Sequence, residues 1–463
     1  MELPAKQNTM KGVGKMKEKT FTFKGGIHPP YSKELTRSIS LTKATDPAMV
    51  YIPLQQHIGA PAELLVKKGE QVKVGQKIGE AKGFVSVPVH SSVSGIVKEI
   101  GTYPTPIGTK VKTIIIENDT KNEIHENVQP KGKIENLSSN KIIEIIKEAG
   151  ITGMGGASFP THVKLSPPED KKIDTVILNG AECEPYLTSD HRLMVEYSEK
   201  VIYGLKAIMK AIGVSKGIIG IENNKPDAIE AIRTMLLDEP GIQIAVLETK
   251  YPQGGEKRLI DAITGRKVSP GSLPMDVGVV VDNVGTAAAI ADAIQSGMPL
   301  IERIVTVTGS GIKKPQNLVV KIGTLFKDII EQCDGYLGDI GKIISGGPMM
   351  GFALYTDEVP VIKGTSGILV LDQKDTCHEE EQPCLKCARC VDVCPVGLLP
   401  IKIANYSSLS MWEEAKEYHA LFCIECGSCS FICPSKRPLV QRIRLAKGEI
   451  LAQQRANKGG LKK

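Results

Sequence analysis

The stretch Cys384-Leu-Lys-Cys387-Ala-Arg-Cys390-Val-Asp-Val-Cys394-Pro395 decides the fold of the C-terminal part of the chain. The same pattern, C-x2-C-x2-C-x3-C-P, returns at Cys423-Ile-Glu-Cys426-Gly-Ser-Cys429-Ser-Phe-Ile-Cys433-Pro434. Two such runs are typical of proteins with two [4Fe–4S] clusters, in which three close thiolates bind one cube and the fourth binds the other. The repeat therefore predicts one cluster on Cys384, Cys387, Cys390 and Cys433, and a second on Cys423, Cys426, Cys429 and Cys394.

Two other uses of these cysteines are less well supported by the spacing. Structural zinc sites pair one C-x2-C with a distant pair of ligands, whereas here four cysteines follow one another closely. Disulfides are not expected, because the sequence has the features of an intracellular protein. Three of the eleven cysteines lie outside the motifs, and two of them, Cys333 and Cys377, are predicted to be small buried or surface thiols.

The rest of the chain has the composition of a globular multidomain protein. At 463 residues it is too long for one compact core, and it should form roughly three or four domains. Hydrophobic residues make up 41% and charged residues 24%, while 46 glycines and only 4% aromatics favour a loop-rich α/β or β chain. No apolar run is long enough for a membrane span, since the best candidate, 277–298, contains Asp282 and Asp292.

The net charge of +6 is small and is concentrated at the C-terminus. Residues 434–463 carry nine Lys or Arg against one acid, Glu449. Such an end suits an acidic partner or an anionic membrane surface, or it is a solvated tail, and it does not predict nucleic-acid binding.

The N-terminus lacks the apolar core of a secretory signal, so we expect a cytoplasmic protein with a flexible leader over residues 1–16.

Residues 140–300 alternate helical and strand patterns. A helix predicted over 141–149 ends at Gly150 and is followed by Gly153-Met-Gly155-Gly156-Ala-Ser-Phe159-Pro160. A loop of this kind lets backbone N–H groups approach a phosphate or a ring, with Lys164 as the counter-charge. Taken alone, the loop is better explained as an ordinary tight turn. It is not a Rossmann fingerprint, because no strand precedes it.

Polar loops also follow the predicted strands at 174–178, 242–247 and 277–281, and a further strand is predicted at 217–222. Open α/β sheets bind ligands at the carboxyl ends of their strands. These loops therefore predict a flavin or nucleotide pocket, with ordinary loop chemistry as the alternative for each one taken alone. The loops are Asn179-Gly-Ala-Glu182-Cys183-Glu184-Pro185-Tyr186, Tyr251-Pro-Gln-Gly254-Gly255-Glu256-Lys257 and Asp282-Asn283-Val-Gly285-Thr286.

Three further segments have module-like patterns. Residues 50–100 contain short strands with regular turn glycines, which predicts a barrel-sandwich hybrid like a biotinyl or lipoyl domain. Lys82 is not expected to carry a swinging-arm group, because the motif match around it is only partial. Residues 301–371, with strands at 304–308 and 318–322 and a helix at 324–332, resemble a β-grasp module. The spacer 397–422 predicts two short helices, as in α-helical ferredoxin modules.

The loop motifs resemble the FMN and NADH site of the complex I flavoprotein subunit. They are Gly153-x-Gly155-Gly156-x-x-Phe159-Pro160-Thr161, Asn179-x-x-Glu182-x-Glu184-Pro185, Tyr251-x-x-Gly254-x-Glu256 and Asn283-Val. From about Lys19 to Arg442 the chain is similar to the RnfC family, a component of the Rnf electron-transport complex. That resemblance is carried by the two cysteine motifs together with Phe23-Lys-Gly25-Gly26-Ile27-His28-Pro29-Pro30, Gln56-His57-Ile58-Gly59-Ala60-Pro61 and Ser345-Gly-Gly347-Pro348-Met-Met-Gly351.

The resemblance also implies which residues form the site. NADH would lie near Phe159, Glu184 and Glu256. Met154, Ala181 and Cys183 depart from the complex I pattern of arginine, aspartate and serine, so Cys183 is either a flavin neighbour or a core thiol. No acid–base catalyst is expected, because a hydride passes directly between stacked rings. The implied FMN contacts are Gly153, Gly155, Gly156, Lys164, Asn179, Glu182, Tyr251, Gly254 and Asn283.

The expected architecture is a multidomain α/β protein. Its cofactors would be two [4Fe–4S] clusters and FMN, with NAD(H) as substrate, because a flavin converts between two-electron and one-electron chemistry. The expected divisions are a flexible leader over 1–20, a barrel-sandwich hybrid over 21–135, a Rossmann-like FMN/NADH domain over 136–300, a β-grasp (SLBB-like) domain over 301–372, an α-helical two-cluster domain over 373–440 and a basic tail over 441–463.

The resemblance implies a peripheral subunit on the cytoplasmic face of the cell membrane. It would exchange hydride with NAD(H) and reach the membrane only through other Rnf subunits, which couple ferredoxin oxidation to Na⁺ or H⁺ transport; no nucleic acid is expected as a partner. Two alternatives remain. One is a soluble cobalamin reductase of the microcompartment type. The Phe23–Pro30 motif and the barrel-sandwich segment argue against it. The other is an electron adaptor with clusters but no flavin.

Overall fold

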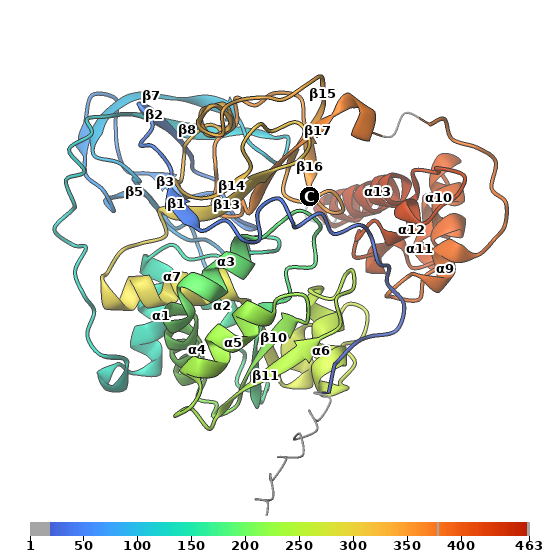
Figure 1. Cartoon of the computed structure of the whole chain (residues 1–463), viewed down its shortest axis with the longest axis horizontal. Coiled ribbons are helices and arrows are strands. Elements are labelled where there is room, and N and C mark those ends of the chain that lie inside the picture. The colour runs from blue at the N-terminus through green and yellow to red at the C-terminus, as the bar shows by residue number, and fades with distance from the viewer. Residues whose placement is uncertain (1–18, 377–378, 461–463) are drawn as a thin grey trace, which may run out of the picture.

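The computed structural model of the chain describes residues 19–376 and 379–460. Most of the expected leader over residues 1–20 lies outside the described residues, and so does Cys377. Figure 1 shows a strand-rich upper body, an α/β body in green below it and a helical lobe in red to one side.

A four-stranded parallel sheet forms the centre of the α/β body. Its strand order is β11-β10-β9-β12, and neighbouring strands all run parallel. The four strands predicted from the sequence are confirmed, with ends that differ by a few residues. They are β9 (Thr175–Gly180), β10 (Gly217–Glu222), β11 (Ile242–Leu247) and β12 (Val279–Asn283).

Both faces of this sheet are covered, which explains why its strands are almost continuously apolar. Val176 and Leu178 pack into the core on one face, and Ile177 between them packs into the core on the other. The first core contains residues of α1 (Ser139–Glu148), α4 (Ser198–Ile212), α5 (Pro226–Met235) and α7 (Val284–Gln295), and the second contains residues of α6 (Glu256–Thr264). Two short helices, α2 (Thr161–Lys164) and α3 (Ser189–Glu196), lie in the loops of this domain.

Two small antiparallel sheets share one core in the region predicted to be a barrel-sandwich hybrid. Their strand orders are β2-β8-β7-β4 and β3-β5-β6. Val50 and Ile52 of one sheet pack with Ile78 and Val89 of the other. The strands are β2 (Met49–Pro53), β3 (Glu63–Leu64), β4 (Gln71–Val72), β5 (Lys77–Glu80), β6 (Val89–His90), β7 (Gly95–Pro104) and β8 (Lys110–Asn118).

A six-stranded mixed sheet with one helix, α8 (Phe326–Gln332), occupies the region expected to be β-grasp. Its order is β1-β14-β13-β17-β15-β16, and β1 joins it by parallel pairing with β14. β1 lies within the range 21–135 expected for the barrel-sandwich domain, and its strand partner belongs to the six-stranded sheet. The strands are β1 (Leu41–Lys43), β13 (Glu302–Thr308), β14 (Gln316–Lys321), β15 (Ile340–Ser345), β16 (Phe352–Leu354) and β17 (Gly367–Asp372).

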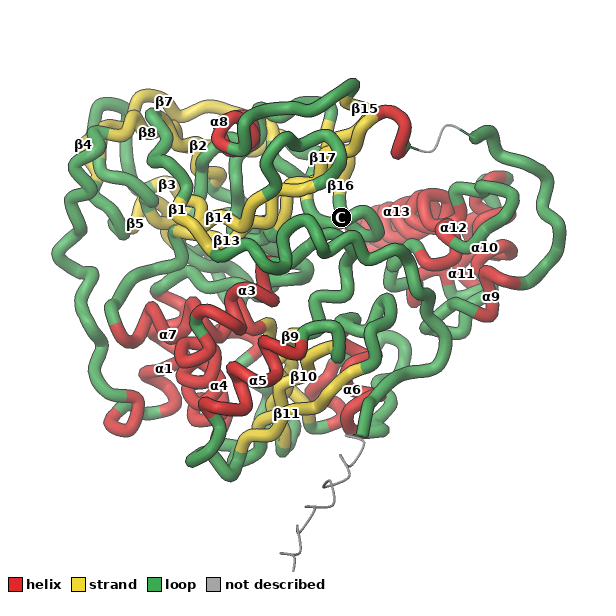
Figure 2. Tube along the Cα trace, in the orientation of Figure 1, coloured by secondary structure: helices red, strands yellow, loops and turns green. Residues whose placement is uncertain are grey.

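The elements of the C-terminal lobe are helices, which Figure 2 shows in red. The two helices predicted between the cysteine motifs are present as α10 and α11. The helices are α9 (Arg389–Asp392), α10 (Pro400–Ser408), α11 (Trp412–Glu417), α12 (Ser428–Phe431) and α13 (Leu439–Gly460). In the described parts of the chain, no helix combines the length and apolar character needed to cross a bilayer.

The described part of the expected basic tail over residues 441–463 belongs to the helix α13. Ile443 and Ile450 of α13 are 1% exposed and pack in one core with α10 and α11. Its basic residues are also used inside the lobe: Arg444 Nε donates to Glu425 Oε2 at 2.9 Å, and Lys447 Nζ donates to the carbonyl of Cys423 at 2.8 Å. The local charge excess was visible in the sequence, whereas its internal carboxylate partner was not.

Residues 19–43, which we call the N-terminal strap, connect the three bodies. Phe21 N donates to Val246 O of β11 at 2.8 Å. Gly26 N donates to Val393 O of the helical lobe at 2.9 Å, and β1 at the end of the strap pairs with β14 of the six-stranded sheet. The strap therefore fixes the α/β body, the helical lobe and the six-stranded sheet relative to one another.

Candidate functional site

The loops that the sequence singled out meet at the carboxyl edge of the parallel sheet. Asn179 at the end of β9 lies opposite Asn283 at the end of β12 in the strand register. Asn179 Nδ2 donates to the carbonyl of Gly254 at 2.8 Å, and Asn283 Nδ2 donates to the carbonyl of Asn179 at 3.3 Å. The loops after β9, β11 and β12 are thus linked by two asparagine side chains, as expected for an open α/β sheet.

The glycine loop lies beside this edge and presents bare backbone. Gly153 N donates to the carbonyl of Phe159 at 2.8 Å, which closes the loop, while Gly155 and Gly156 are exposed. Gly155 has φ +69°, and a Cβ there would lie 2.9 Å from Asn283 Nδ2. Gly155 is therefore required both by its backbone conformation and by close contact with Asn283.

Lys164, in α2, brings a charge to the same place. Its Nζ donates to the carbonyl of Val281 at 2.7 Å and lies 3.4 Å from Asp282 Oδ1 and 3.7 Å from Glu256 Oε1. Burial alone would lower the pKa of the Lys164 ammonium, but the two carboxylates outweigh it and raise that pKa. Lys164 therefore keeps its positive charge in a position where an anionic ligand group can use it.

Gln253 is a buried polar side chain near this edge that has no hydrogen-bond partner at either amide atom among the described residues. The carboxylate oxygens of Asp282 are also buried without a hydrogen bond, but Oδ1 forms the ion pair with Lys164. Unpartnered buried polar groups are rare in folded proteins and usually indicate a water or ligand. Together with the bare glycine backbone and the charged Lys164, they give the donors and acceptors that a phosphate and an isoalloxazine ring need, so the residues present fit FMN.

Glu182 and Glu184 were both predicted as ligand contacts. Their carboxylates accept hydrogen bonds from other parts of the chain. Glu182 Oε1 accepts from Asp190 N at 2.7 Å at the start of α3, and its Oε2 accepts from His191 N at 3.1 Å. Glu184 accepts from the backbone N–H groups of Met349 and Met350, at 3.1 and 2.8 Å. Burial raises the pKa of Glu184 to about 7 despite these donors. We therefore assign neither carboxylate to the ligands below.

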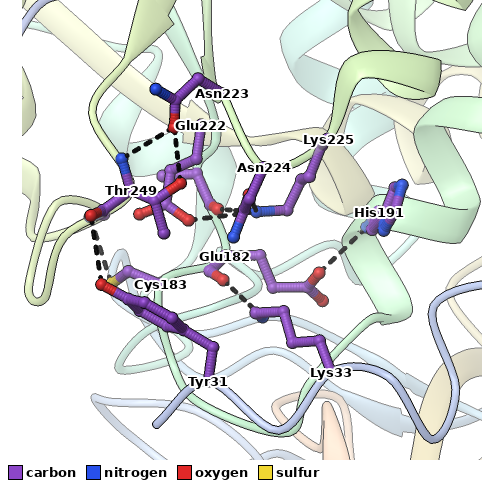
Figure 3. Close-up of polar contacts among 12 residues, drawn as sticks. Tyr31, Lys33, Glu182, Cys183, His191, Glu222, Asn223, Asn224, Lys225 and Thr249 are labelled. Carbon is purple, nitrogen blue, oxygen red and sulfur yellow. Dashed lines mark hydrogen bonds and ion pairs between the residues drawn. The ribbon is translucent and has the colours of Figure 1, made fainter. Parts of the chain in front are cut away.

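Two buried lysines that sequence reasoning missed hold the loop carrying these acids, residues 181–187 (Figure 3). Lys33 Nζ donates to the carbonyls of Glu182 at 2.8 Å, Glu184 at 3.0 Å and Leu187. Lys225 Nζ donates to the carbonyl of Ala181 at 2.6 Å and to Glu222 Oε2 at 3.1 Å.

This loop is strained, because Glu182 and Tyr186 have positive φ values of 46° and 69°. Hydrogen bonds from two ammonium groups stabilise such a conformation. The nearest sequence signal for Lys33 was its place just after the Phe23–Pro30 motif, but a lysine has no periodicity that predicts burial.

Cys183 and Tyr251 connect this edge of the sheet to the helical lobe. Gly254 N donates to Cys183 Sγ at 3.2 Å, and the Tyr251 hydroxyl donates to the carbonyl of Cys426 at 2.8 Å. Tyr251 is 1% exposed and packs with Cys183, Cys426 and Ile27 of the N-terminal strap. The polar end of Tyr251, which was predicted to contact the flavin, is therefore directed at a cysteine turn.

Four cysteines of the lobe face one cavity, and we call them the inner quartet: Cys394, Cys423, Cys426 and Cys429. Cys426 and Cys429 are buried, and the other two are half-buried. Burial, together with the neighbouring thiols of Cys426 and Cys394, raises the pKa of the Cys423 thiol to about 11, although Glu425 N and Lys447 act to lower it. The structure thus brings Cys394 from the first motif beside three cysteines of the second.

The outer quartet is Cys384, Cys387, Cys390 and Cys433. Burial and the neighbouring thiols of Cys433 and Cys384 raise the pKa of Cys390, which places a second-motif cysteine beside the first motif. Cys384 and Cys387 are exposed. Across residues 19–376 and 379–460, no group of three or more His, Cys, Asp or Glu side chains converges as the ligands of a single metal ion. A [4Fe–4S] cube gives each of four thiolates its own iron, and the thiol-only donor sets fit that group.

Four protein-family models match separate parts of the chain. They are an RnfC barrel sandwich hybrid domain at residues 21–121, a Nuo51 FMN-binding domain at 146–292, an SLBB domain at 304–353 and a 4Fe-4S dicluster domain at 376–434. The multidomain α/β class expected from the sequence is therefore confirmed.

Curated relatives match along almost the whole chain. The RnfC protein of the Na⁺-translocating ferredoxin:NAD⁺ oxidoreductase complex of Acetobacterium woodii is 52% identical over 95% of this chain and 99% of its own. The corresponding protein of the proton-translocating complex of Clostridium ljungdahlii is 48% identical over 92% and 94% of the two chains. That of the ion-translocating oxidoreductase complex of Rhodobacter capsulatus is 42% identical over 94% and 84%. The chain belongs to the RnfC family, whose members are components of the ion-translocating ferredoxin:NAD⁺ oxidoreductase (Rnf) complexes.

Proposed function

We propose that this chain is the NAD(H)-handling subunit of an ion-translocating ferredoxin:NAD⁺ oxidoreductase. It exchanges hydride between NAD(H) and a bound FMN and passes single electrons through two [4Fe–4S] clusters. Its partners are the membrane and ferredoxin-like subunits of the complex, which couple the electron flow to translocation of Na⁺ or H⁺. The chain lies at the cytoplasmic face of the membrane and is held there by those partners.

The observation that carries this proposal is the hydrogen bond from Tyr251 to the carbonyl of Cys426. Tyr251 belongs to the loop whose Gly254 is tied to Asn179 and Cys183 at the carboxyl edge of the sheet. One loop therefore contacts both the candidate flavin pocket and the inner quartet. An electron-transfer protein needs such proximity between its two-electron and one-electron centres.

The residues of the pocket have separate roles in this proposal. The backbone N–H groups of Gly155 and Gly156 and the ammonium of Lys164 bind the flavin, while Gly153 lines the loop that its N–H closes through Phe159. Asn179, Gly254 and Asn283 contact the flavin from the carboxyl edge of the sheet. Phe159 and Glu256, at the mouth, are the residues we assign to the nicotinamide nucleotide. When bound, FMN converts between the hydride chemistry of NAD(H) and the one-electron chemistry of the clusters.

The quartets of cysteines hold the two clusters in the crossed arrangement that the motifs predict. The inner cluster takes Cys394 together with Cys423, Cys426 and Cys429. The outer cluster takes Cys433 together with Cys384, Cys387 and Cys390. Prolines after the last cysteine of each motif, Pro395 and Pro434, end the short helices so that the fourth thiol leaves toward the other cluster.

The test is a visible spectrum of protein purified and reconstituted without oxygen. We expect flavin bands that NADH bleaches, and about eight iron and eight sulfide per chain, as two [4Fe–4S] clusters require. A spectrum with clusters alone would contradict flavin binding and leave the adaptor alternative. The cobalamin reductase would be favoured instead if the protein reduced added cobalamin with NADH but exchanged no electrons with ferredoxin in the presence of membranes that carry the partner subunits.

A further inference from the structure

The two cysteine turns have the same backbone geometry. In the outer turn Lys386 N donates to Cys384 Sγ at 3.4 Å, and in the inner turn Glu425 N donates to Cys423 Sγ at 3.3 Å. Lys386 and Glu425 also share a left-handed backbone, with φ of 54° and 57°. Because the two turns match locally, any functional difference between them comes from what covers each turn.

The inner turn is covered by the rest of the molecule. Ile424, which follows Cys423, packs with Ile27, Cys183 and Met349, residues of three segments outside the lobe. Arg444 and Lys447 of α13 pair with Glu425 of the same turn. The inner quartet therefore faces the loops of the candidate flavin pocket, and solvent has little access to it.

Within residues 19–376 and 379–460, no segment covers the outer turn in this way. Every residue from 381 to 389 is exposed. Leu385 occupies the position that Ile424 has in the inner turn, and it is 70% exposed. Lys386 and Arg389 stand where the inner turn has Glu425 and Ser428, so this turn is also more basic. An exposed apolar residue flanked by charges, next to a predicted redox centre, is the composition of a docking surface.

We infer that the inner quartet exchanges electrons with the flavin pocket and that the outer quartet exchanges them with a redox partner protein seated on residues 384–389. The inner turn shows what this turn shape packs against: an apolar surface beside the candidate flavin site. The partner accordingly offers an apolar contact to Leu385 and acidic side chains to Lys386 and Arg389, which favour fast encounter. This inference rests on the proposed function and adds the order of the two clusters and the surface of exchange.

The number of electrons is conserved at each step of the proposed transfer. One electron leaves the partner's reduced centre and reduces the outer cluster, and the outer cluster is reoxidised as it reduces the inner one. Two such electrons and one proton reach NAD⁺ as a hydride. The reverse sequence oxidises NADH, and no further oxidant or reductant is needed in either direction.

The order of the clusters is tested on the loaded, full-length protein without any mutation. An iron chelator is added anaerobically until about half of the iron is lost, that is, one of two clusters. The freed cysteines are then alkylated and identified by mass spectrometry. We expect the label on Cys384, Cys387, Cys390 and Cys433. Label on the inner quartet, or equal label on both, would overturn the assignment.

The same half-depleted protein reports on the electron path. After reduction with dithionite, its remaining clusters should be oxidised by NAD⁺, because the inner quartet faces the pocket. Clusters that stay reduced, in protein whose flavin still responds to NADH, would overturn the proposed order. If NADH fails to bleach the flavin of the intact protein, the proposed function fails, whereas the labelling of the cysteines still decides which quartet is the outer one.

The docking surface is tested with Leu385→Glu and a matched control, Leu409→Glu. Leu409 is 69% exposed and lies at the end of α10, in the same lobe but outside both cysteine turns. Each loaded protein is added to membranes that contain the partner subunits and lack this chain, and NAD⁺ reduction by reduced ferredoxin is followed against protein concentration.

We expect Leu385→Glu to weaken the apparent affinity about thirtyfold, the loss typical of a central interface residue. Leu409→Glu should match the unsubstituted protein, and all three should reduce ferricyanide with NADH at the same rate. Equal affinities for the two variants would overturn the docking surface.

Discussion

Replacing Lys33 with methionine should loosen the loop 181–187 specifically. The ammonium donates to three carbonyls of this loop and is only 5% exposed, so methionine would leave all three without a donor. Each unsatisfied buried carbonyl lowers the free energy of unfolding by about 1–3 kcal/mol, whereas removing a buried charge raises it by several kcal/mol. Burial lowers the pKa of Lys33, which shows the same desolvation cost. The net loss of local stability should be about 3 kcal/mol.

Hydrogen exchange measures this loss where it occurs. Tyr186 N donates to the carbonyl of Tyr31 at 2.8 Å in the folded loop, so its protection reports opening of the loop. A loss of about 3 kcal/mol corresponds to roughly hundredfold faster exchange in peptides covering residues 180–188, with β7 and β8 unchanged. The control is Lys24→Met, in the same strap but exposed. Equal protection of the loop in the two variants would refute the role given to Lys33.

Three further predictions follow from single contacts. The pKa of Glu184 is raised from 4.5 to about 7 in the folded protein, so its contribution to stability is full below pH 4.5 and is lost as the pH rises past 7. This contribution is at most about 3 kcal/mol. Glu184→Gln should therefore flatten the dependence of the urea unfolding midpoint on pH between pH 5 and 8, and an unchanged pH dependence would contradict this. Gly155→Ala, at φ +69° and against Asn283, should weaken FMN binding about tenfold in a fluorescence titration, more than Gly156→Ala at its open neighbour; equal affinities would count against the pocket. A Cβ at Gly204 would lie 1.9 Å from the carbonyl of Ala287, so Gly204→Ala should cost about 1–3 kcal/mol in chemical unfolding, and a wild-type midpoint would show that α4 and α7 can move apart.

The elements of the α/β body were predictable because their signals are local. β10 and β11 occupy the residue ranges that the apolar runs predicted, and α5 begins at Pro226, a residue suited to the first turn of a helix. The meeting of the polar loops followed from one general property of parallel sheets, so Asn179 and Asn283 could be placed together without coordinates.

What the sequence did not reveal depends on contacts between distant segments. Lys33 and the loop that it holds are about 150 residues apart, and no spacing rule joins them. The resemblance implied Glu182 as an FMN contact, but only the orientation of α3 shows that its carboxylate accepts hydrogen bonds from the helix N-terminus. The basic residues of α13 looked like a free tail because their acidic partner, Glu425, lies in another motif.

The position of the N-terminal strap has a consequence for biosynthesis. The ribosome makes the chain from the N-terminus at about 5–20 residues per second, so Val393 is added roughly 20–70 s after its hydrogen-bond partner Gly26. Ile27 lacks its packing partners Cys183 and Tyr251 during the first part of that interval, and it lacks Val393 and Ile424 of the helical lobe at least until the end. The strap therefore completes its contacts only after the helical lobe has been made.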